Sequence, residues 1–321
     1  MKKIICFILA CVLVLPFAGI DARAAAMGGA YTAIAKGYSA AYWNPAGITD
    51  NLFLSFGASG SVCGKLSDIS KVSDFINNPD YTNIPDLDVG SDLMLGIQFL
   101  NYGLSNVTRL ELNAARDDYG KASGYNELIF TYGLKLADLP LNLAELNLGA
   151  NLKYINSELA TATFDTQTQT TESGSGIGVD LGVLVGVSEI VKVGLTIKDI
   201  GARVKYTGEK TVFPNSPEST PSRTEKIPVS IQLGASASLP LVGTVLAADI
   251  HTRDGDTTVH CGVEQGLGLM AFRLGARTDA DSGDILWSAG VGLRAAMVFF
   301  DLAYVQTATD SEIMLAGSFK F

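Results

Sequence analysis

The chain has 321 residues, of which 47% are hydrophobic and only 17% are charged. Ordinary soluble domains carry about 25% charged residues, so this composition is unusually apolar for a protein dissolved in water. The formal net charge is −10 at pH 7. An acidic chain does not neutralise phosphate groups, so the composition argues against nucleic acid as a partner.

The first residues have the pattern of an export signal. A basic start of one methionine and two lysines is followed by an apolar run from residue 4 to residue 18. Small residues then stand at positions 22 and 24, a spacing that signal peptidase recognises. We therefore expect residues 1–24 to be a cleaved signal peptide, with cleavage after Ala24 or, as the alternative, after Ala26. A permanent N-terminal anchor would need a longer apolar run of about 20 residues.

Residues 227–248 are the best candidate for a membrane-spanning helix, because none of them is charged. Their apolar side chains nevertheless alternate with polar or small ones. Ile231 and Leu233 fall on one face, while Ser230 and Gln232 fall on the other. A repeat of two residues indicates a strand. An exported, apolar chain of such strands fits an outer-membrane barrel, because a closed barrel satisfies its backbone hydrogen bonds within lipid.

Fourteen segments have this strand character, so residues 52–321 are predicted to form an all-β, 14-stranded antiparallel transmembrane barrel. Tight turns alternate with long connections, among them residues 64–91, 157–176 and 200–226. A soluble β-sandwich also alternates, but it gives no reason for that asymmetry. The predicted strands are residues 52–62, 92–100, 105–115, 125–136, 144–156, 177–187, 191–199, 227–239, 244–252, 257–267, 269–278, 285–295, 297–306 and 312–321.

Residues 27–47 are mostly small and end in an Asn-Pro-Ala-Gly segment. A barrel of fourteen strands is wider than one of about eight, whose interior side chains fill the lumen, and narrower than a water-filled porin. Something must therefore occupy its interior, and we predict that residues 25–51 form a plug there. Because the residue before a proline is pushed toward an extended conformation, we expect the chain to turn from plug to wall at Asn44.

Charged residues within apolar strands are expected to face the lumen. An Arg or Lys that faces lipid at mid-depth costs about 2–4 kcal/mol, and an acid costs less. Two interpretations remain open for such a set: a structural network of ion pairs within the wall, or a site for a polar ligand group or a gate. The candidate lumen charges are Asp180, Lys192, Glu264, Arg273, Arg294 and Asp301.

No residue pattern indicates an enzyme, a metal site or a cofactor. His251 and His260 flank a predicted turn at residues 253–256 and would lie close together across that hairpin. A nucleophilic triad also needs a positioned serine and an orienting acid, and no serine stands in a Gly-x-Ser-x-Gly turn. We interpret both histidines as surface residues of the hairpin. Cys63 and Cys261 do not define a disulfide framework, and we expect them to be unpaired.

The small-residue segment also resembles a known signature. Together with weaker motifs in several strands, it resembles the N-terminal signature of the FadL-type outer-membrane transporters, and within that superfamily it looks closest to the PorV/PorQ family. The C-terminal Phe321 resembles the aromatic signal of barrels delivered to the outer-membrane assembly machinery. The signature residues are Gly28, Gly29, Tyr31, Asn44, Pro45, Ala46 and Gly47.

The resemblance implies a non-enzymatic, monomeric barrel in the lipid of a bacterial outer membrane. In FadL-type transporters, long-chain fatty acids or other hydrophobic compounds pass through the barrel and leave sideways into the membrane. In the PorV type, the barrel is a partner or shuttle for proteins exported by the type IX secretion system. We therefore expect passive uptake of hydrophobic small molecules such as long-chain fatty acids. The alternative is a secretion-associated barrel that binds exported proteins.

Overall fold

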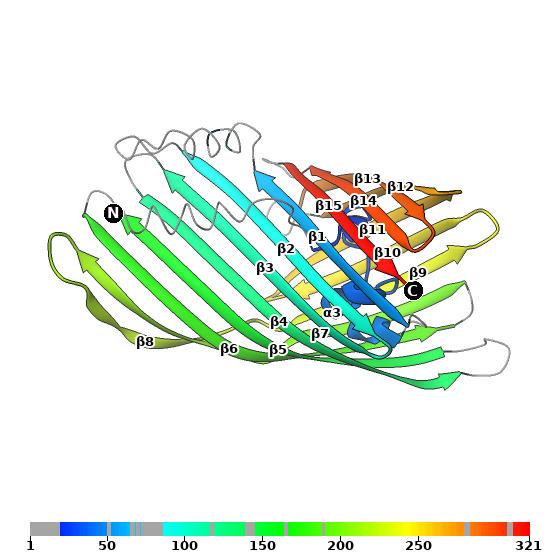
Figure 1. Ribbon diagram of the computed structural model, residues 1–321, viewed down its shortest axis with the longest axis horizontal. Coiled ribbons are helices and arrows are strands. Elements are labelled where there is room, and N and C mark those ends of the chain that lie inside the picture. The colour runs from blue at the N-terminus through cyan, green and yellow to red at the C-terminus, as the bar shows by residue number, and fades with distance from the viewer. Residues whose placement is uncertain are drawn as a thin grey trace.

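The computed structural model describes residues 20–49, 53–64, 68, 71, 86–115, 119–138, 145–163, 166–187, 190–278, 283–306 and 311–321. Across these residues, fifteen antiparallel strands form one continuous sheet (Figure 1). Strand β1 pairs with β15, and β6 pairs with β7, so that fourteen strands close into a barrel and β8 remains as an extra strand on β7. The predicted fourteen-stranded barrel is confirmed.

The bounds of the elements are as follows. The plug contains helices α2 (Ala22–Ala26) and α3 (Ala40–Trp43) and the 3-10 turns η1 (Gly37–Ser39) and η2 (Pro45–Thr49). The strands are β1 (Leu54–Gly64), β2 (Leu87–Phe99), β3 (Tyr102–Ala115), β4 (Tyr119–Asp138), β5 (Glu145–Thr163), β6 (Thr168–Gly186), β7 (Val191–Val212), β8 (Glu218–Lys226), β9 (Ser230–Leu239), β10 (Thr244–Arg253), β11 (Asp256–Leu267), β12 (Met270–Thr278), β13 (Ile285–Ala295), β14 (Val298–Gln306) and β15 (Ser311–Lys320).

The wall is apolar outside and polar or small inside, the reverse of a soluble protein. On β6, Ile177 and Leu181 are exposed on the outer face, whereas Asp180 between them is buried. The outer face of the same strand becomes polar at Ser175. Alternation of this kind over about ten residues is the pattern of a barrel that spans a membrane. None of the helices among the described residues has the length and apolar character needed to cross a membrane.

The wall is much taller on one side than on the other. Strands β4 to β7 have 20, 19, 19 and 22 residues, whereas β9 has 10 and β14 has 9. The prediction that residues 157–176 and 200–226 are loops is therefore wrong, because the former extend β5 and β6 and most of the latter form the end of β7 and β8. In this upper part both faces of the sheet are polar, so the sequence shows no apolar alternation there.

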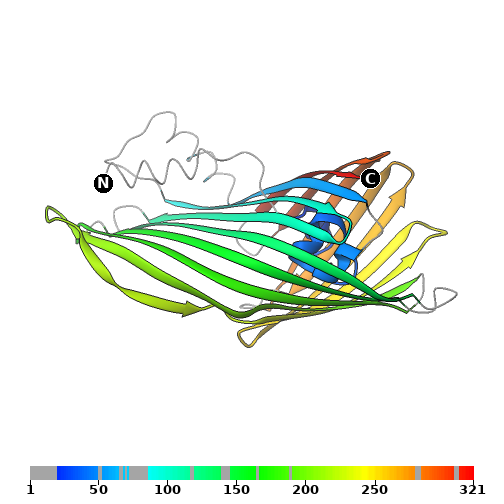
Figure 2. The same ribbon diagram turned by 60° about the horizontal axis from the view of Figure 1, so that its bottom comes forward.

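Residues 20–49, which precede β1, lie inside the barrel (Figure 2). Most of residues 20–49 are buried, including Met27, Ile48 and Asn44 at 0% exposure. The Asn44 backbone is extended, with φ −154° and ψ 108°, as predicted for the residue before Pro45. Its side-chain amide donates to the carbonyl oxygens of Thr32 (2.9 Å) and of Val183 in the wall (3.1 Å). Asn44 thus fixes the end of the plug against β6.

Inward-facing glycines let the plug approach the wall closely. A Cβ atom on Gly149 would lie 2.1 Å from the carbonyl carbon of Pro45, and one on Gly275 would lie 2.0 Å from the Gly28 amide nitrogen. Gly182 and Gly262 meet the plug in the same way. Close backbone approach is a common reason for glycine within a strand. The small plug residues and these wall glycines therefore form one packed interface.

Candidate functional site

The plug is held to the wall through its backbone at two neighbouring strands. Asp249 of β10 accepts hydrogen bonds from the backbone amides of Tyr31 and Thr32, both at 2.8 Å. His260 of β11 donates from Nδ1 to the Gly28 carbonyl oxygen at 2.6 Å. Asp249 and His260 are paired directly across the two strands. These two wall residues therefore satisfy three backbone hydrogen-bonding groups of the plug.

The interpretation of both histidines as surface residues is wrong for His260, which is only 6% exposed. The rings of His251 and His260 do lie close together, with centroids 4.1 Å apart. His251 Nε2 is 3.3 Å from the Asp249 carboxylate. The inward face of this hairpin is covered by the plug, so proximity to a turn does not expose the side chains. His260 binds the plug directly, and His251 lies against Asp249 and His260, the two wall residues that bind the plug backbone.

Glu264 is the centre of one lumen charge cluster. Its carboxylate accepts from Arg23 Nε of the plug at 2.7 Å and from Arg273 Nε at 2.6 Å, and it also contacts Arg294. Arg273 donates its Nη1 to Asp301 at 2.7 Å. The side chains of Arg273 and Glu264 are 1% and 3% exposed. Buried charges at this density persist only when they are paired, and here the pairing joins plug and wall.

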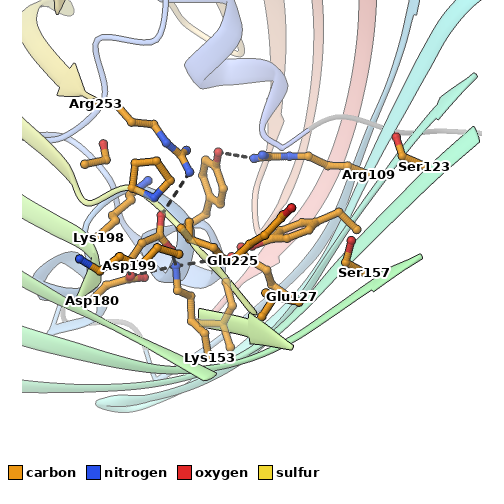
Figure 3. A pocket seen from close by; sticks show the side chains of 18 of the residues that line it. Arg109, Ser123, Glu127, Lys153, Ser157, Asp180, Lys198, Asp199, Glu225 and Arg253 are labelled. Atoms are coloured by element: carbon orange, nitrogen blue, oxygen red, sulfur yellow. Dashed lines mark hydrogen bonds and ion pairs between the residues drawn. The ribbon is translucent and has the colours of Figure 1, made fainter. Parts of the chain in front are cut away.

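A second cluster surrounds Lys153 of β5. The Lys153 ammonium is 2.9 Å from Asp180 and 3.4 Å from Glu127, and it also contacts Asp199. Asp180 accepts in addition from the backbone amide of Asp199 at 2.8 Å and from the side chain of Asn151 at 2.9 Å. Three carboxylates from three different strands thus converge on one ammonium group (Figure 3).

The six predicted lumen charges do not form one network. Glu264, Arg273, Arg294 and Asp301 are brought together, but Asp180 belongs to the cluster around Lys153. Lys192 is the second residue of β7, in the same half of the strand as Lys198, and has no ion pair among the described residues. Strand alternation predicts which face a charge occupies, but it carries no information about height in the barrel or about distance around its circumference.

A bulge in β7 places two successive charged residues on the lumen side. Lys198 and Asp199 are 8% and 6% exposed, although neighbours along a regular strand face opposite sides. The register of β7 against β6 shifts here, and Asp199 and Gly201 have positive φ values of 63° and 68°. A bulge re-aims side chains in this way. Lys198 faces the lumen by regular alternation with Thr196, and the bulge adds Asp199 to the same side, where it joins the cluster around Lys153.

Above the plug, the tall part of the wall encloses a cavity of about 460 Å³, a typical size for a small-molecule pocket. Its floor includes Ala41 and Tyr42 of α3, and its sides are formed by β3 to β8, the start of β9 and the end of β10. The Tyr42 hydroxyl accepts a hydrogen bond from Arg109 at 2.5 Å (Figure 3). The Lys198 ammonium lies 4.2 Å from the centre of the Tyr42 ring, within cation–π range.

Sequence reasoning missed several residues of this site. Lys153 and Asp249 are charged residues within strands, so the criterion that found Glu264 would also have found them. Arg23 lies within the predicted signal peptide of residues 1–24, and Lys198 lies within the predicted strand of residues 191–199. The described part of the chain contains no group of three or more His, Cys, Asp or Glu side chains arranged to hold a metal ion.

Comparison with solved structures of known proteins shows which class of fold this chain has. No sequence-family profile matches the chain, and no curated protein sequence matches it. Among solved structures, the Ralstonia pickettii toluene transporter TbuX is similar, with a TM-score of 0.67 and 15% identity over 96% of this chain and 100% of that one. The P. putida toluene transporter TodX has a TM-score of 0.60 and 12% identity, covering 93% of this chain and 97% of the other.

A Pseudomonas aeruginosa FadL homologue is similar as well, with a TM-score of 0.61 and 12% identity over 96% of this chain and 99% of its own. At these identities the similarity shows the fold. The chain therefore has the fold of the FadL-type outer-membrane channels for hydrophobic compounds: a fourteen-stranded barrel with its N-terminal segment in the lumen. The closeness to the PorV/PorQ family stays a prediction.

Proposed function

We propose that this protein is an outer-membrane channel for the passive uptake of hydrophobic or amphipathic small molecules. The observation that carries the proposal is the cavity of about 460 Å³ on top of a plug that is packed against the wall. A solute that enters the open, tall end of the barrel reaches a pocket of small-molecule size. The names of the similar structures, which are toluene transporters and a FadL homologue, support the same class of solute.

The plug favours an exit through the wall over an exit straight through the lumen. Asp249 and His260 of the wall bind its backbone, while its own Asn44 and Arg23 bind the Val183 carbonyl oxygen and Glu264 of the wall. Moving the plug aside would break all of these contacts. A hydrophobic solute gains nothing from a water-filled exit, whereas the outer face of the wall leads directly into lipid.

The wall has a weak seam beside the cavity. Pairing of β7 with β9 ends at Lys198 and Ser230, and pairing of β7 with β8 begins at Arg203 and Lys226. One further backbone hydrogen bond, from the Ile227 amide to the Ala202 carbonyl oxygen at 3.1 Å, narrows the interval between them. The chain between β8 and β9 contains Pro228, which lines the cavity and has no amide hydrogen to donate. The described residues therefore leave a gap in the backbone ladder at the height of the cavity. We propose this seam as the lateral exit.

Uptake measurements test the proposal. Cells that lack the gene and the same cells carrying it on a plasmid are incubated with radiolabelled toluene and with labelled long-chain fatty acid, and initial uptake rates are compared. We expect slower uptake of at least one hydrophobic compound without the gene, full recovery with it, and no dependence on the proton gradient. Equal rates with and without the gene across a panel of such compounds would refute the proposal.

Long-chain fatty acid as the specific cargo stays a prediction, and so does the alternative of a secretion-associated barrel that binds exported proteins. The monomeric state is likewise a prediction. The uptake panel addresses the first directly, because it compares a long-chain acid with a compact hydrocarbon in the same cells. A pull-down with the purified barrel as bait would test the second, because exported proteins that bind its tall outer wall would be recovered with it.

A further inference from the structure

The outer face of the wall changes from apolar to basic along β7. Ile200 continues the apolar outer surface of this strand, and Arg203 and Lys205 follow it as exposed cations. Val204, between the two cations, is buried in the lumen in a cluster with Ile155. Because successive residues of a strand face opposite sides, the side chains of Arg203 and Lys205 both point away from the lumen.

A third cation joins these two from the extra strand β8. Lys226 is paired directly with Arg203, and Thr224 is paired with Lys205. Directly paired residues lie on the same face of a sheet, and like charges in such a pair are destabilising. Lys226 also borders the cavity, because β8 ends at the seam. All three cations are exposed, and within the described residues none of them forms an ion pair or a side-chain hydrogen bond.

Nearby acidic residues do not neutralise these cations. Glu225 is paired with Val204 and so lies on the lumen face. On the outer face, Glu209 lies four residues beyond Lys205, and Glu158 lies two strands away on β5. Both are more than about 10 Å from Lys205 along the sheet, beyond the Debye length of about 8 Å at physiological ionic strength. The three cations therefore form a positively charged patch, the outer basic cluster: Arg203, Lys205 and Lys226.

Apolar surface borders the outer basic cluster on its membrane side. Ile177 of β6 is paired with Arg203 and is 66% exposed, and Val179 beside it belongs to the same lipid-facing band. Ser175 is paired with Lys205 and adds a polar group next to the cations. Basic residues directly beyond a lipid-facing band lie at the level of the lipid headgroups, where they attract anionic lipid.

We propose that the outer basic cluster binds the phosphate group of an anionic lipid in the outer leaflet, with the acyl chains of that lipid against Ile177 and Val179. The planar guanidinium of Arg203 matches two phosphate oxygens, and Lys205 and Lys226 add charge on either side. A phosphate between Arg203 and Lys226 also removes the repulsion between these paired cations.

The arrangement favours a lipid over a free anion. The outer basic cluster is exposed and flat, and exposed ion pairs contribute little on their own because water and salt screen them. A lipid gains in addition from its acyl chains, because the apolar surface of Ile177 and Val179 is continuous with the charges. Only a ligand with both a phosphate and an acyl chain makes use of both surfaces.

The bound lipid would also hold β8 in place. This strand pairs with β7 alone, and its other edge has no partner among the described strands. A phosphate that bridges Arg203 and Lys226 connects β7 to β8 at the end of β8 next to the seam. We therefore expect lipid binding to slow hydrogen exchange of the β8 backbone amides.

Native mass spectrometry of the purified protein in detergent tests the inference, with lipid A, a diphosphorylated glycolipid, as the probe. We expect lipid A to bind, and a triple variant of the outer basic cluster to bind it at least about tenfold more weakly, because three headgroup contacts are lost. That variant is Arg203→Gln/Lys205→Gln/Lys226→Gln. The matched control removes the same charge elsewhere and should bind as the wild type does: Lys121→Gln/Lys192→Gln/Lys210→Gln.

Two further ligands identify the source of the phosphate. Inorganic phosphate at millimolar concentration should not displace lipid A, because it lacks acyl chains. Phosphatidylcholine should bind the wild type and the cluster variant equally, because its choline balances its phosphate. Displacement of lipid A by inorganic phosphate would reveal a site for free anions and overturn the lipid assignment.

The variants give the decisive comparison. Equal binding of lipid A by the wild type and the cluster variant would overturn the inference, and so would an equal loss in the control variant, which would show an effect of net charge alone. Heat-shifted gel mobility verifies folding. If the triple variant does not fold, Arg203→Gln/Lys226→Gln replaces it under the same criteria. Lipid A should slow β8 exchange in the wild type only, and unchanged exchange contradicts the bridge. None of these measurements depends on uptake.

Discussion

At the scale of single residues, polar side chains of the wall hold an otherwise apolar plug in place. Asp249 is the clearest case, since one carboxylate oxygen serves two plug amides and the other has no hydrogen-bond partner. Glu264 has the corresponding role for charge, because it accepts from arginines of both plug and wall. Each of these residues can be tested by a single substitution.

Asp249→Ala should loosen the plug. The change leaves the buried amides of Tyr31 and Thr32 without an acceptor, and each such unsatisfied group costs about 1–3 kcal/mol. We expect a lower temperature for the loss of heat-resistant gel mobility and faster cleavage by protease within the plug. Asp254→Asn, in the exposed turn after β10, is the control and should resemble the wild type, because Asn tolerates the positive φ of 53° there. An unchanged transition temperature in Asp249→Ala would contradict the anchoring role.

Glu264→Gln should destabilise the barrel more strongly. Removal of one partner from a buried ion-pair cluster typically costs about 3–5 kcal/mol, because the remaining charges stay buried. Here Arg23 and Arg273 would lose their shared carboxylate. Urea-dependent unfolding measured by the gel-mobility shift should move to lower urea. Glu218→Gln on the exposed strand β8 serves as the control, and equal midpoints for the two variants would refute the prediction.

At the scale of elements, the strands that face lipid were predictable from the sequence and the strands above lipid were not. Alternation marks β9 because Ile231 and Leu233 face outward while Gln232 faces inward. The upper halves of β5 to β7 and all of β8 have two polar faces, so their pattern resembles that of a loop. The site shows the same limit: Glu264 stands out within an apolar strand, whereas Asp199 reaches the lumen side only through the bulge in β7.

The packing of plug against wall gives a prediction for the elements. Gly149→Ala on β5 would place a methyl group 2.1 Å from the Pro45 carbonyl carbon, so either the plug or the strand must move. We expect less folded protein in the outer membrane and greater protease sensitivity of the plug. Gly90→Ala on β2, where the nearest atoms would be 3.7 Å away, is the matched control. Wild-type behaviour of Gly149→Ala would show that the contact is looser than described.

At the scale of the whole molecule, three features define the proposed route: a tall open wall, a cavity above the plug, and a seam where β7 passes from β9 to β8. The exposed outer band of large apolar residues faces lipid next to that seam. A hydrophobic or amphipathic solute would thus leave water in the cavity and enter the membrane through the wall. The route makes the cavity, rather than the plug, the place to block transport.

The most direct test is therefore to fill the cavity and measure uptake. Ser157 lines the cavity from β5, whereas Asn156 faces the other side of the same strand. Initial uptake rates of the labelled compound that depends on the gene are compared for Ser157→Trp and Asn156→Trp at equal amounts of folded barrel. The account predicts that Ser157→Trp lowers the rate to that of cells without the gene and that Asn156→Trp keeps the wild-type rate. Wild-type uptake by Ser157→Trp would contradict the proposal that solutes pass through this cavity.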